Sequence, residues 1–231
     1  FLILDKTDFL IDSKIKLWDI TNSSCIVTFS DHSSKVTDLK FALNKSNILV
    51  SSSLDGTVRA YDLVKYKNFR IMTTSSPTQF ISLAVNFSGE IVCAGGMDPF
   101  SIYIWSLKTG DLIEILNGHT GPVNCLAFSK VKDFLVSGSW DKTVKTWELY
   151  SKGSFLETFD HSHEIVSLDI SPNDSEVSAC TLNGEIYNWD ISIGVMKNIL
   201  DCSRDIWGGR QRADKAVSKK ILRNKHFNSI N

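Results

Sequence analysis

The sequence has few cysteines and prolines, no excess charge of either sign and no long apolar run. Among its 231 residues are five cysteines and four prolines, and the formal net charge is −1. The cysteine count is odd and no Cys-x-x-Cys pair occurs, which argues against a disulfide framework or a zinc site. No run of about 18 apolar residues is present, so we expect no membrane span and no membrane partner. No secretory signal is visible, so we expect any targeting segment to lie outside this sequence.

Four of the cysteines lie in stretches that we predict to be strands: Cys25, Cys93, Cys125 and Cys180. Cysteine in such a position usually behaves as a small buried apolar residue. We therefore expect these four and Cys202 to be free core thiols in a reducing compartment. We also expect no cofactor, no metal and no small-molecule substrate.

The clearest feature that is present is a unit of strands and turns at Gly118–Leu149. Three stretches rich in β-branched and apolar residues, with turn residues between them, predict strands over Val123–Phe128, Leu135–Ser139 and Val144–Leu149. A fourth strand is expected over Phe155–Phe159.

This unit recurs along the chain. An aromatic residue returns at intervals of 42 to 44 residues, at Trp18, Tyr61, Trp105, Trp147 and Trp189. A turn residue lies six positions before it at Asp12, Asp55, Asp141 and Asn183, and seven before it at Asp98. A histidine lies in the loop before the first strand at His32, His119 and His161. Such a period is typical of repeat architectures.

The spacing predicts a buried polar chain in each complete unit. In the unit at 118–149, Asp141 would accept from His119, which would reach Ser137, which would accept from the Trp147 indole. Ser, His and Asp together also suggest a hydrolase triad. An active site occurs once, whereas this set recurs, so we interpret these residues as structural fasteners and expect no catalytic residue.

The other units keep this set only in part. His32, Ser51 and Asp55 match it, but Tyr61 replaces the tryptophan, so we expect a weakened chain there. The unit that contains Trp105 has no histidine.

The unit with His161, Asn183 and Trp189 has Ala179 in place of serine, and we expect the three polar residues to form its network. Strands of these units are predicted over Ile15–Ile20, Cys25–Phe29, Val36–Phe41, Ile48–Ser52, Val58–Leu63, Phe69–Met72, Ile165–Ile170, Val177–Thr181, Ile186–Ile191 and Val195–Leu200. No full first strand fits before Trp18.

The pattern resembles the WD-repeat family, whose units are four-stranded blades of a β-propeller. The resemblance implies an all-β fold with about five blades present in part or whole, as a fragment of a seven-bladed ring. We expect the end of a preceding blade at 1–30, blades at 31–73, 74–117, 118–160 and 161–200, a basic insertion at 201–226 and the start of a further blade at 227–231.

Basic charge is concentrated after the last complete unit. Residues 201–225 carry Arg204, Arg210, Arg212, Lys215, Lys219, Lys220, Arg223 and Lys225 against three aspartates. An apolar stripe predicts a helix over 211–223. The insertion suits a phosphate backbone, an acidic partner or the role of a solvated linker. Arg204, Arg210, Arg212, Lys219 and Lys220 are candidate contacts for a partner or RNA.

Trp140 is a large aromatic residue beside the tight turn at Asp141. It is a candidate anchor for a partner protein or RNA. The alternative is that it packs on the neighbouring blade.

A closer resemblance lies in the runs Val50–Leu63, Tyr66–Arg70, Pro77–Phe80, Ser137–Val144 and Arg204–Arg210. These runs are similar to the periodic tryptophan protein 2 family. Thr78-Gln79-Phe80 without the preceding histidine, and the basic insertion after the Trp189 blade, are features that generic WD repeats lack. The chain would then be part of the second of two propellers.

The resemblance implies a non-catalytic scaffold in ribosome biogenesis, a subunit of the nucleolar small-subunit processome needed for 18S rRNA maturation. Its partners would be the other WD-repeat subunits of the UTP-B subcomplex, with pre-rRNA or a small nucleolar RNP as further candidates. The alternative is a generic WD-repeat adaptor, such as a ubiquitin-ligase substrate receptor or a coat component. An enzyme on this scaffold would need a polar set that occurs once, whereas this one repeats.

Overall fold

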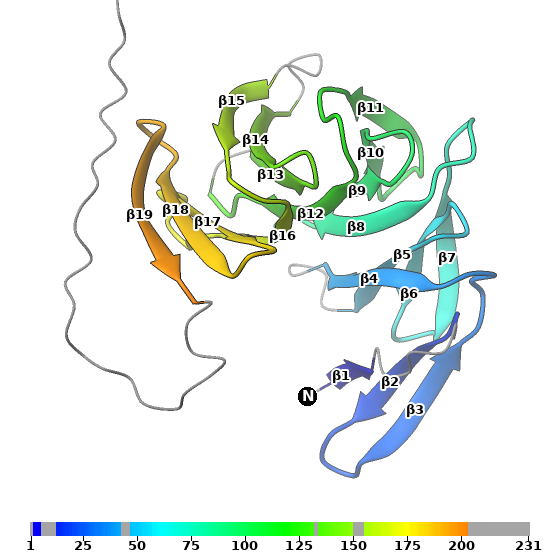
Figure 1. Cartoon of the computed structure of the whole chain (residues 1–231). Helices are drawn as coiled ribbons and strands as arrows, with labels where there is room; N and C mark the ends of the chain where they lie inside the picture. Colours follow the sequence, from blue (N-terminus) through cyan, green and yellow to red (C-terminus); the bar gives the residue numbers. More distant parts are fainter. Residues whose placement is uncertain (1, 6–12, 43–46, 132–133, 150–154, 203–231) are drawn as a thin grey trace, which may run out of the picture.

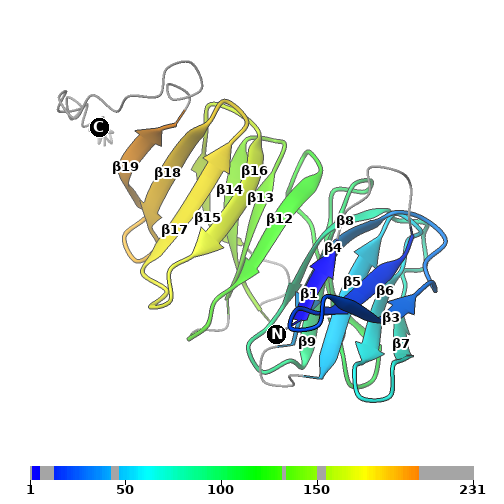
Figure 2. The same ribbon diagram turned by 90° about the horizontal axis from the view of Figure 1, so that it is seen from below.

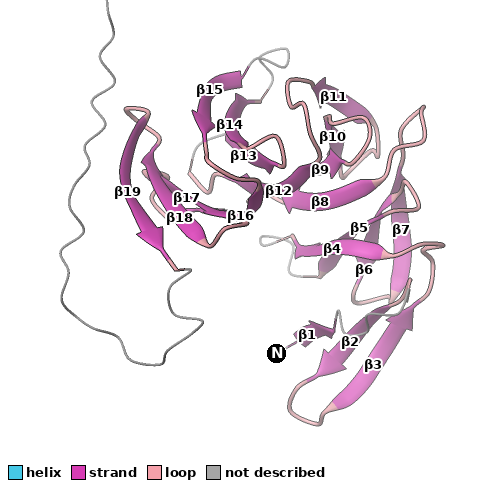
Figure 3. Cartoon of the chain, viewed as in Figure 1, coloured by secondary structure: helices cyan, strands magenta, loops and turns pink. Residues whose placement is uncertain are grey.

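The computed structural model describes residues 2–5, 13–42, 47–131, 134–149 and 155–202. Every regular element among these residues is a β-strand, which confirms the all-β class (Figure 3). No helix that could cross a bilayer is found in these ranges. The helix predicted over 211–223 lies outside the described residues.

The strands form five antiparallel sheets, which we number in chain order. Sheet one contains β1 (Leu2–Asp5), β2 (Ile15–Asp19) and β3 (Ser24–Phe29); sheet two contains β4 (Val36–Phe41), β5 (Ile48–Ser53), β6 (Val58–Asp62) and β7 (Lys67–Met72). Sheet three contains β8 (Phe80–Val85), β9 (Ile91–Gly96), β10 (Ile102–Ser106) and β11 (Leu112–Leu116). Sheet four contains β12 (Val123–Phe128), β13 (Phe134–Ser139), β14 (Thr143–Glu148) and β15 (Phe155–Asp160). Sheet five contains β16 (Ile165–Ile170), β17 (Glu176–Thr181), β18 (Glu185–Asp190) and β19 (Val195–Asp201).

Within each sheet the strands pair in chain order, and no sheet shares a strand with another. The first strands of sheets two to five, β4, β8, β12 and β16, approach one another at the centre (Figure 1). The fourth strands lie at the rim, and Figure 2 shows the sheets side by side from below. The described residues thus form an open arc of propeller blades, as expected of a partial propeller.

The core consists of apolar layers between successive sheets. The tryptophan face of sheet four, with Leu135 and Trp147, packs on Ile104 of sheet three. The opposite face packs Val136 and Val144 on sheet five. Equivalent layers join sheet one to sheet two and sheet two to sheet three. Sheets two, three and four are therefore covered on both faces, because each blade uses its two sides for its two neighbours.

Two expectations need correction or refinement. Cys93 is buried, but Cys25 and Cys202 are exposed, so the expectation of core thiols is wrong for these two. The physical reason for Cys25 is that it lies on β3, at the outer edge of its sheet, where one side of the strand meets solvent. Before β2, the strand β1 pairs antiparallel with it and so occupies the second position of the blade.

Candidate functional site

Sheet four contains a continuous hydrogen-bonded chain of four buried or half-buried side chains. The Trp147 indole donates to Ser137 Oγ over 2.7 Å, and Ser137 Oγ lies 2.7 Å from His119 Nε2. His119 Nδ1 lies 2.7 Å from the Asp141 carboxylate. One proton arrangement satisfies all four groups: indole to serine, serine to Nε2, and Nδ1 to the carboxylate. The loop before β12 and the turn after β13 are thereby joined to the core.

Asp141 also organises its own turn. Its carboxylate accepts from the backbone amides of Thr120 and Thr143 and from the Thr143 hydroxyl. Burial alone would raise the pKa of this carboxyl, but the hydrogen bonds from His119, Thr143 and Thr120 outweigh burial and hold its pKa far below the usual range. Asp141 is therefore ionised at neutral pH, and its negative charge is stabilised by hydrogen bonds within the turn.

Sheet two has the same chain with one defect. His32 lies 2.8 Å from the Asp55 carboxylate and 2.6 Å from Ser51 Oγ. Tyr61 fills the tryptophan position and is fully buried, but its hydroxyl makes no well-formed hydrogen bond among the described residues. Burial raises the pKa of the Tyr61 phenol. Because the Tyr61 hydroxyl makes no hydrogen bond of normal geometry in the described ranges, the link that the Trp147 indole supplies in sheet four is missing here.

Sheet five differs from the arrangement that we expected. Trp189 Nε1 donates directly to His161 Nε2 over 3.1 Å, and His161 Nδ1 lies 3.0 Å from the Phe159 carbonyl. In the described part of the chain, no hydrogen bond joins Asn183 to His161; the Asn183 amide oxygen accepts instead from the Thr181 hydroxyl. The reason is that Ala179 offers no hydroxyl to bridge the rings, so the indole meets the imidazole itself.

The two remaining sheets lack the histidine link. In sheet three the Trp105 indole donates to the Thr73 carbonyl over 3.3 Å. In sheet one the buried Trp18 indole nitrogen has no partner among the described residues, and Asp12 lies outside them. Among the described residues, the fastener is thus complete in sheet four alone.

Chemically, the chain in sheet four suits a structural role better than a reaction. Ser137 is fully buried, and its hydroxyl is held by both a donor and an acceptor, so it faces no substrate. No group of three or more metal-ligating side chains occurs in the ranges that the structure describes. We interpret the His, Ser, Asp and Trp positions as fasteners of the fold.

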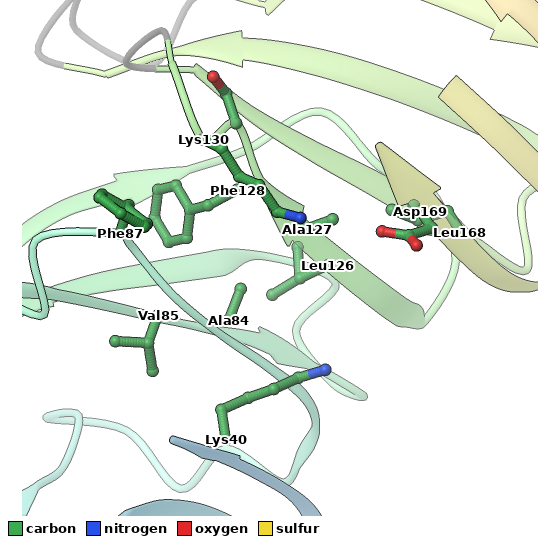
Figure 4. Close-up of a pocket in the computed structure, with 11 residues that line it drawn as sticks. Lys40, Ala84, Val85, Phe87, Leu126, Ala127, Phe128, Lys130, Leu168 and Asp169 are labelled. Carbon is green, nitrogen blue, oxygen red and sulfur yellow. The ribbon is translucent and has the colours of Figure 1, made fainter. Parts of the chain in front are cut away.

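A cavity of about 180 Å³ lies where the inner strands converge (Figure 4). Its lining is mixed: Lys40, Lys130 and Asp169 supply charge, and Leu126 and Phe128 supply apolar surface. Sequence reasoning missed this cavity, because it is made by residues of several blades that no local pattern connects.

Trp140 lies on the surface. It follows β13, it is 49% exposed, and its backbone N–H donates to the Pro122 carbonyl. About half of its surface is therefore open to a partner, and packing of the covered half on the neighbouring blade stays the alternative. Candidates Arg204, Arg210, Arg212, Lys219 and Lys220 lie outside the described residues.

Trp140 has counterparts that sequence reasoning missed. The same position in the other blades is occupied by Leu54, Met97 and Leu182, each with its N–H bonded to the residue before the first strand. The signal that could have found them is the residue before each turn, which is apolar in all four sheets.

The comparisons with known proteins agree with this geometry. A family model described as "WD domain, G-beta repeat" matches residues 23–62, 110–148 and 153–190. Each matched stretch runs from the rim strand of one sheet to the third strand of the next. The chain therefore belongs to the WD-repeat family.

Among its relatives are proteins named periodic tryptophan protein 2. The one from Arabidopsis thaliana is 40% identical and the one from Saccharomyces cerevisiae is 43% identical, each over 219 residues, 95% of this chain and 24% of the relative. Nuclear distribution protein nudF of Aspergillus niger is 26% identical over 79% of this chain and 46% of that protein. The chain spans about a quarter of the length of the first two relatives.

Proposed function

We propose that this chain is part of a non-catalytic WD-repeat scaffold in ribosome biogenesis, a subunit of the nucleolar small-subunit processome needed for 18S rRNA maturation. The observation that carries the proposal is the extent of the similarity to periodic tryptophan protein 2. It covers 95% of the chain at 40% to 43% identity, whereas nudF reaches 26% over 79%. If only the residues common to all WD repeats were shared, other WD proteins would be about as identical to this chain as periodic tryptophan protein 2 is.

The geometry fits a scaffold. The polar residues that could suggest chemistry are buried within blades, whereas the turns and rim strands face outward. In this proposal the outer surfaces contact other WD-repeat subunits of the UTP-B subcomplex, and the basic residues after position 203 contact pre-rRNA, a small nucleolar RNP or an acidic protein.

The first experiment is purification of the tagged full-length protein from cells, followed by identification of the bound proteins and RNA. The proposal expects UTP-B subunits together with pre-rRNA. Recovery with a ubiquitin ligase or a vesicle coat, and without pre-rRNA, would instead support the generic adaptor. Depletion of the protein should cause precursors of 18S rRNA to accumulate, and wild-type protein should restore processing.

A second experiment addresses the basic residues. In the full-length protein, Arg210, Arg212, Lys219 and Lys220 are changed to Glu, and RNA binding is measured over a range of salt concentrations. If each contacts one phosphate of single-stranded RNA, loss of four contacts should reduce the slope of log affinity against log salt by roughly 3. The matched control changes the exposed Lys65, Lys67, Lys108 and Lys130 to Glu. An unchanged slope in the first variant would remove the electrostatic role.

A further inference from the structure

One face of the arc has an apolar row at equivalent turns. Leu54, Met97, Trp140 and Leu182 each follow the second strand of their sheet. Exposure increases along the row, from half-buried Leu54 to 38% for Met97, 49% for Trp140 and 70% for Leu182. The most exposed members of the row therefore lie at sheets four and five. Isolated apolar residues are common on protein surfaces, whereas a row of them at equivalent turns indicates a contact surface.

Four acidic residues lie at the same end of sheets four and five as Trp140 and Leu182. Asp160 pairs in register with Thr143 at the same end of sheet four, and the Glu164 carbonyl accepts from the Leu182 amide. Glu185 follows Leu182 in the next turn, and hydrogen bonds from Asn183, Tyr187 and Ser162 lower the pKa of its carboxyl. Asp201 lies opposite Glu185 in the register of β18 and β19. The exposed Lys142 lies at the same end and supplies one positive charge against these four carboxylates. This part of the face is therefore negative and disfavours a phosphate backbone.

The chain leaves sheet five at this same place. The Cys202 amide donates to the Gly184 carbonyl over 2.9 Å, beside Leu182. The connections from a rim strand to the next inner strand in sheets two to four contain 4 to 7 residues, for example 161–164 and 73–79. By contrast, residues 203–226 number 24, with eight basic and two acidic side chains and the apolar pair Ile206-Trp207.

We propose that in the free protein residues 203–226 lie across the turn face of sheets four and five. Their basic side chains then meet Asp160, Glu164 and Glu185, and their apolar residues cover Trp140 and Leu182. The segment is long enough, because 24 residues span up to about 80 Å when extended. Docking of a segment of the same chain also begins from a high effective concentration. The inference does not rest on the ribosomal role.

The test uses the full chain with the photo-crosslinking residue benzoylphenylalanine at position 140. Cross-links to peptides from 203–226 are expected, with a yield that does not depend on protein concentration. Mixing heavy- and light-isotope copies should give links within one copy only. The control places the same residue at Ile193, which is 67% exposed in the turn between β18 and β19 at the other end of sheet five. This position should give no such link.

A charge variant separates docking from chance proximity. Asp160→Lys with Glu164→Lys should lower the cross-link yield by roughly threefold to tenfold, since exposed ion pairs contribute modestly. Glu90→Lys with Glu148→Lys makes the same charge change at the opposite ends of sheets three and four and should leave the yield unchanged. Circular dichroism checks that both variants are folded.

Three results would overturn the proposal. The first is the absence of any link from position 140 to 203–226 in the full chain. The second is links that join only different copies or a separate protein, which would make the face a site for binding in trans. The third is a yield that neither charge reversal nor added salt reduces, because docking of opposite charges must weaken as screening increases.

Discussion

A single hydroxyl group connects the buried histidine and tryptophan of sheet four. Ser137→Ala would leave His119 Nε2 and the Trp147 indole N–H without their partner. We expect a loss of about 1–3 kcal/mol in the free energy of unfolding, measured by urea denaturation. The loss should lie near the lower limit, because the bond from Trp189 to His161 shows that an indole can meet the imidazole directly.

Asp141→Ala should cost more than Ser137→Ala. It removes the acceptor of His119 Nδ1, of two backbone amides and of the Thr143 hydroxyl, all within one turn. We expect about 2–3 kcal/mol or more by the same measurement. Ser75→Ala, at an exposed loop position, is the control and should change stability by less than about 0.5 kcal/mol. Equal stability of Asp141→Ala and wild type would contradict the role of the network as a fastener.

His161 gives a prediction about pH. Its Nε2 accepts from Trp189, so the ring is neutral, and burial lowers its pKa from the ordinary value of 6.5. Burial lowers the pKa of His32 in the same way. Below pH 6.5 the unfolded chain binds protons that the folded chain does not, so stability should fall as pH decreases from 7 to 5.

The variant His161→Gln should lose part of this pH dependence, because one of the two groups no longer titrates. The exposed His163 supplies the control, and His163→Gln should retain the wild-type dependence. Urea midpoints at several pH values measure it. If His161→Gln and wild type lost stability in parallel between pH 7 and 5, His161 would not be a neutral acceptor in the fold.

How much of the site could be predicted depends on what fixes each residue. In sheet four, strand register and turn length together determine which side chains approach, so spacing alone predicts the four partners. In sheet five the partner of Asn183 depends on Thr181, two positions away, whose hydroxyl is nearer than the imidazole. The sequence alone did not predict that Leu182 and Trp140 share a face, because this depends on how successive sheets are arranged in the arc.

At the scale of strands, prediction succeeded because alternation and turn residues are local properties. Val36–Phe41 and Ile165–Ile170 have the predicted bounds, and β13 and β19 each extend by one residue. The pairing of β1 with β2 could not be predicted, because that blade lacks the spacing of a full unit.

A glycine at position 138 allows sheets four and five to pack closely. A Cβ at Gly138 would lie 2.7 Å from Cys125 Sγ and 2.7 Å from Ile165 Cγ2. Gly138→Val should therefore push the two sheets apart and destabilise the chain by about 1–3 kcal/mol. The equivalent position in sheet five is Cys180, which is half-buried, and Cys180→Val is the matched control with an expected change of less than about 1 kcal/mol. Equal effects of the two substitutions would contradict this account of the interface.

For the whole molecule, the arc makes the sheets unequal. Within the described ranges, sheets two to four have an apolar layer on each side, whereas sheets one and five have one on a single side. The middle of the outward side of sheet five is polar: Ser178 and Asn188 occupy the positions of Val136 and Thr146 in sheet four, and a hydrogen bond joins them. A surface of this kind is compatible with water.

Native-state hydrogen exchange of the 231-residue chain should reveal this inequality. The free energy of opening, measured from amide exchange, should be highest for the central strands β9 and β13. For β17 it should be lower by more than about 1.4 kcal/mol, which is a factor of ten in protection. The reason is that opening sheet five breaks one apolar layer, whereas opening sheet three breaks two. Equal protection at all protein concentrations would mean that the arc unfolds as one unit. Protection of β17 that increases with concentration would instead mean that a second copy covers its outward side, contrary to the polar pair Ser178 and Asn188 at its middle.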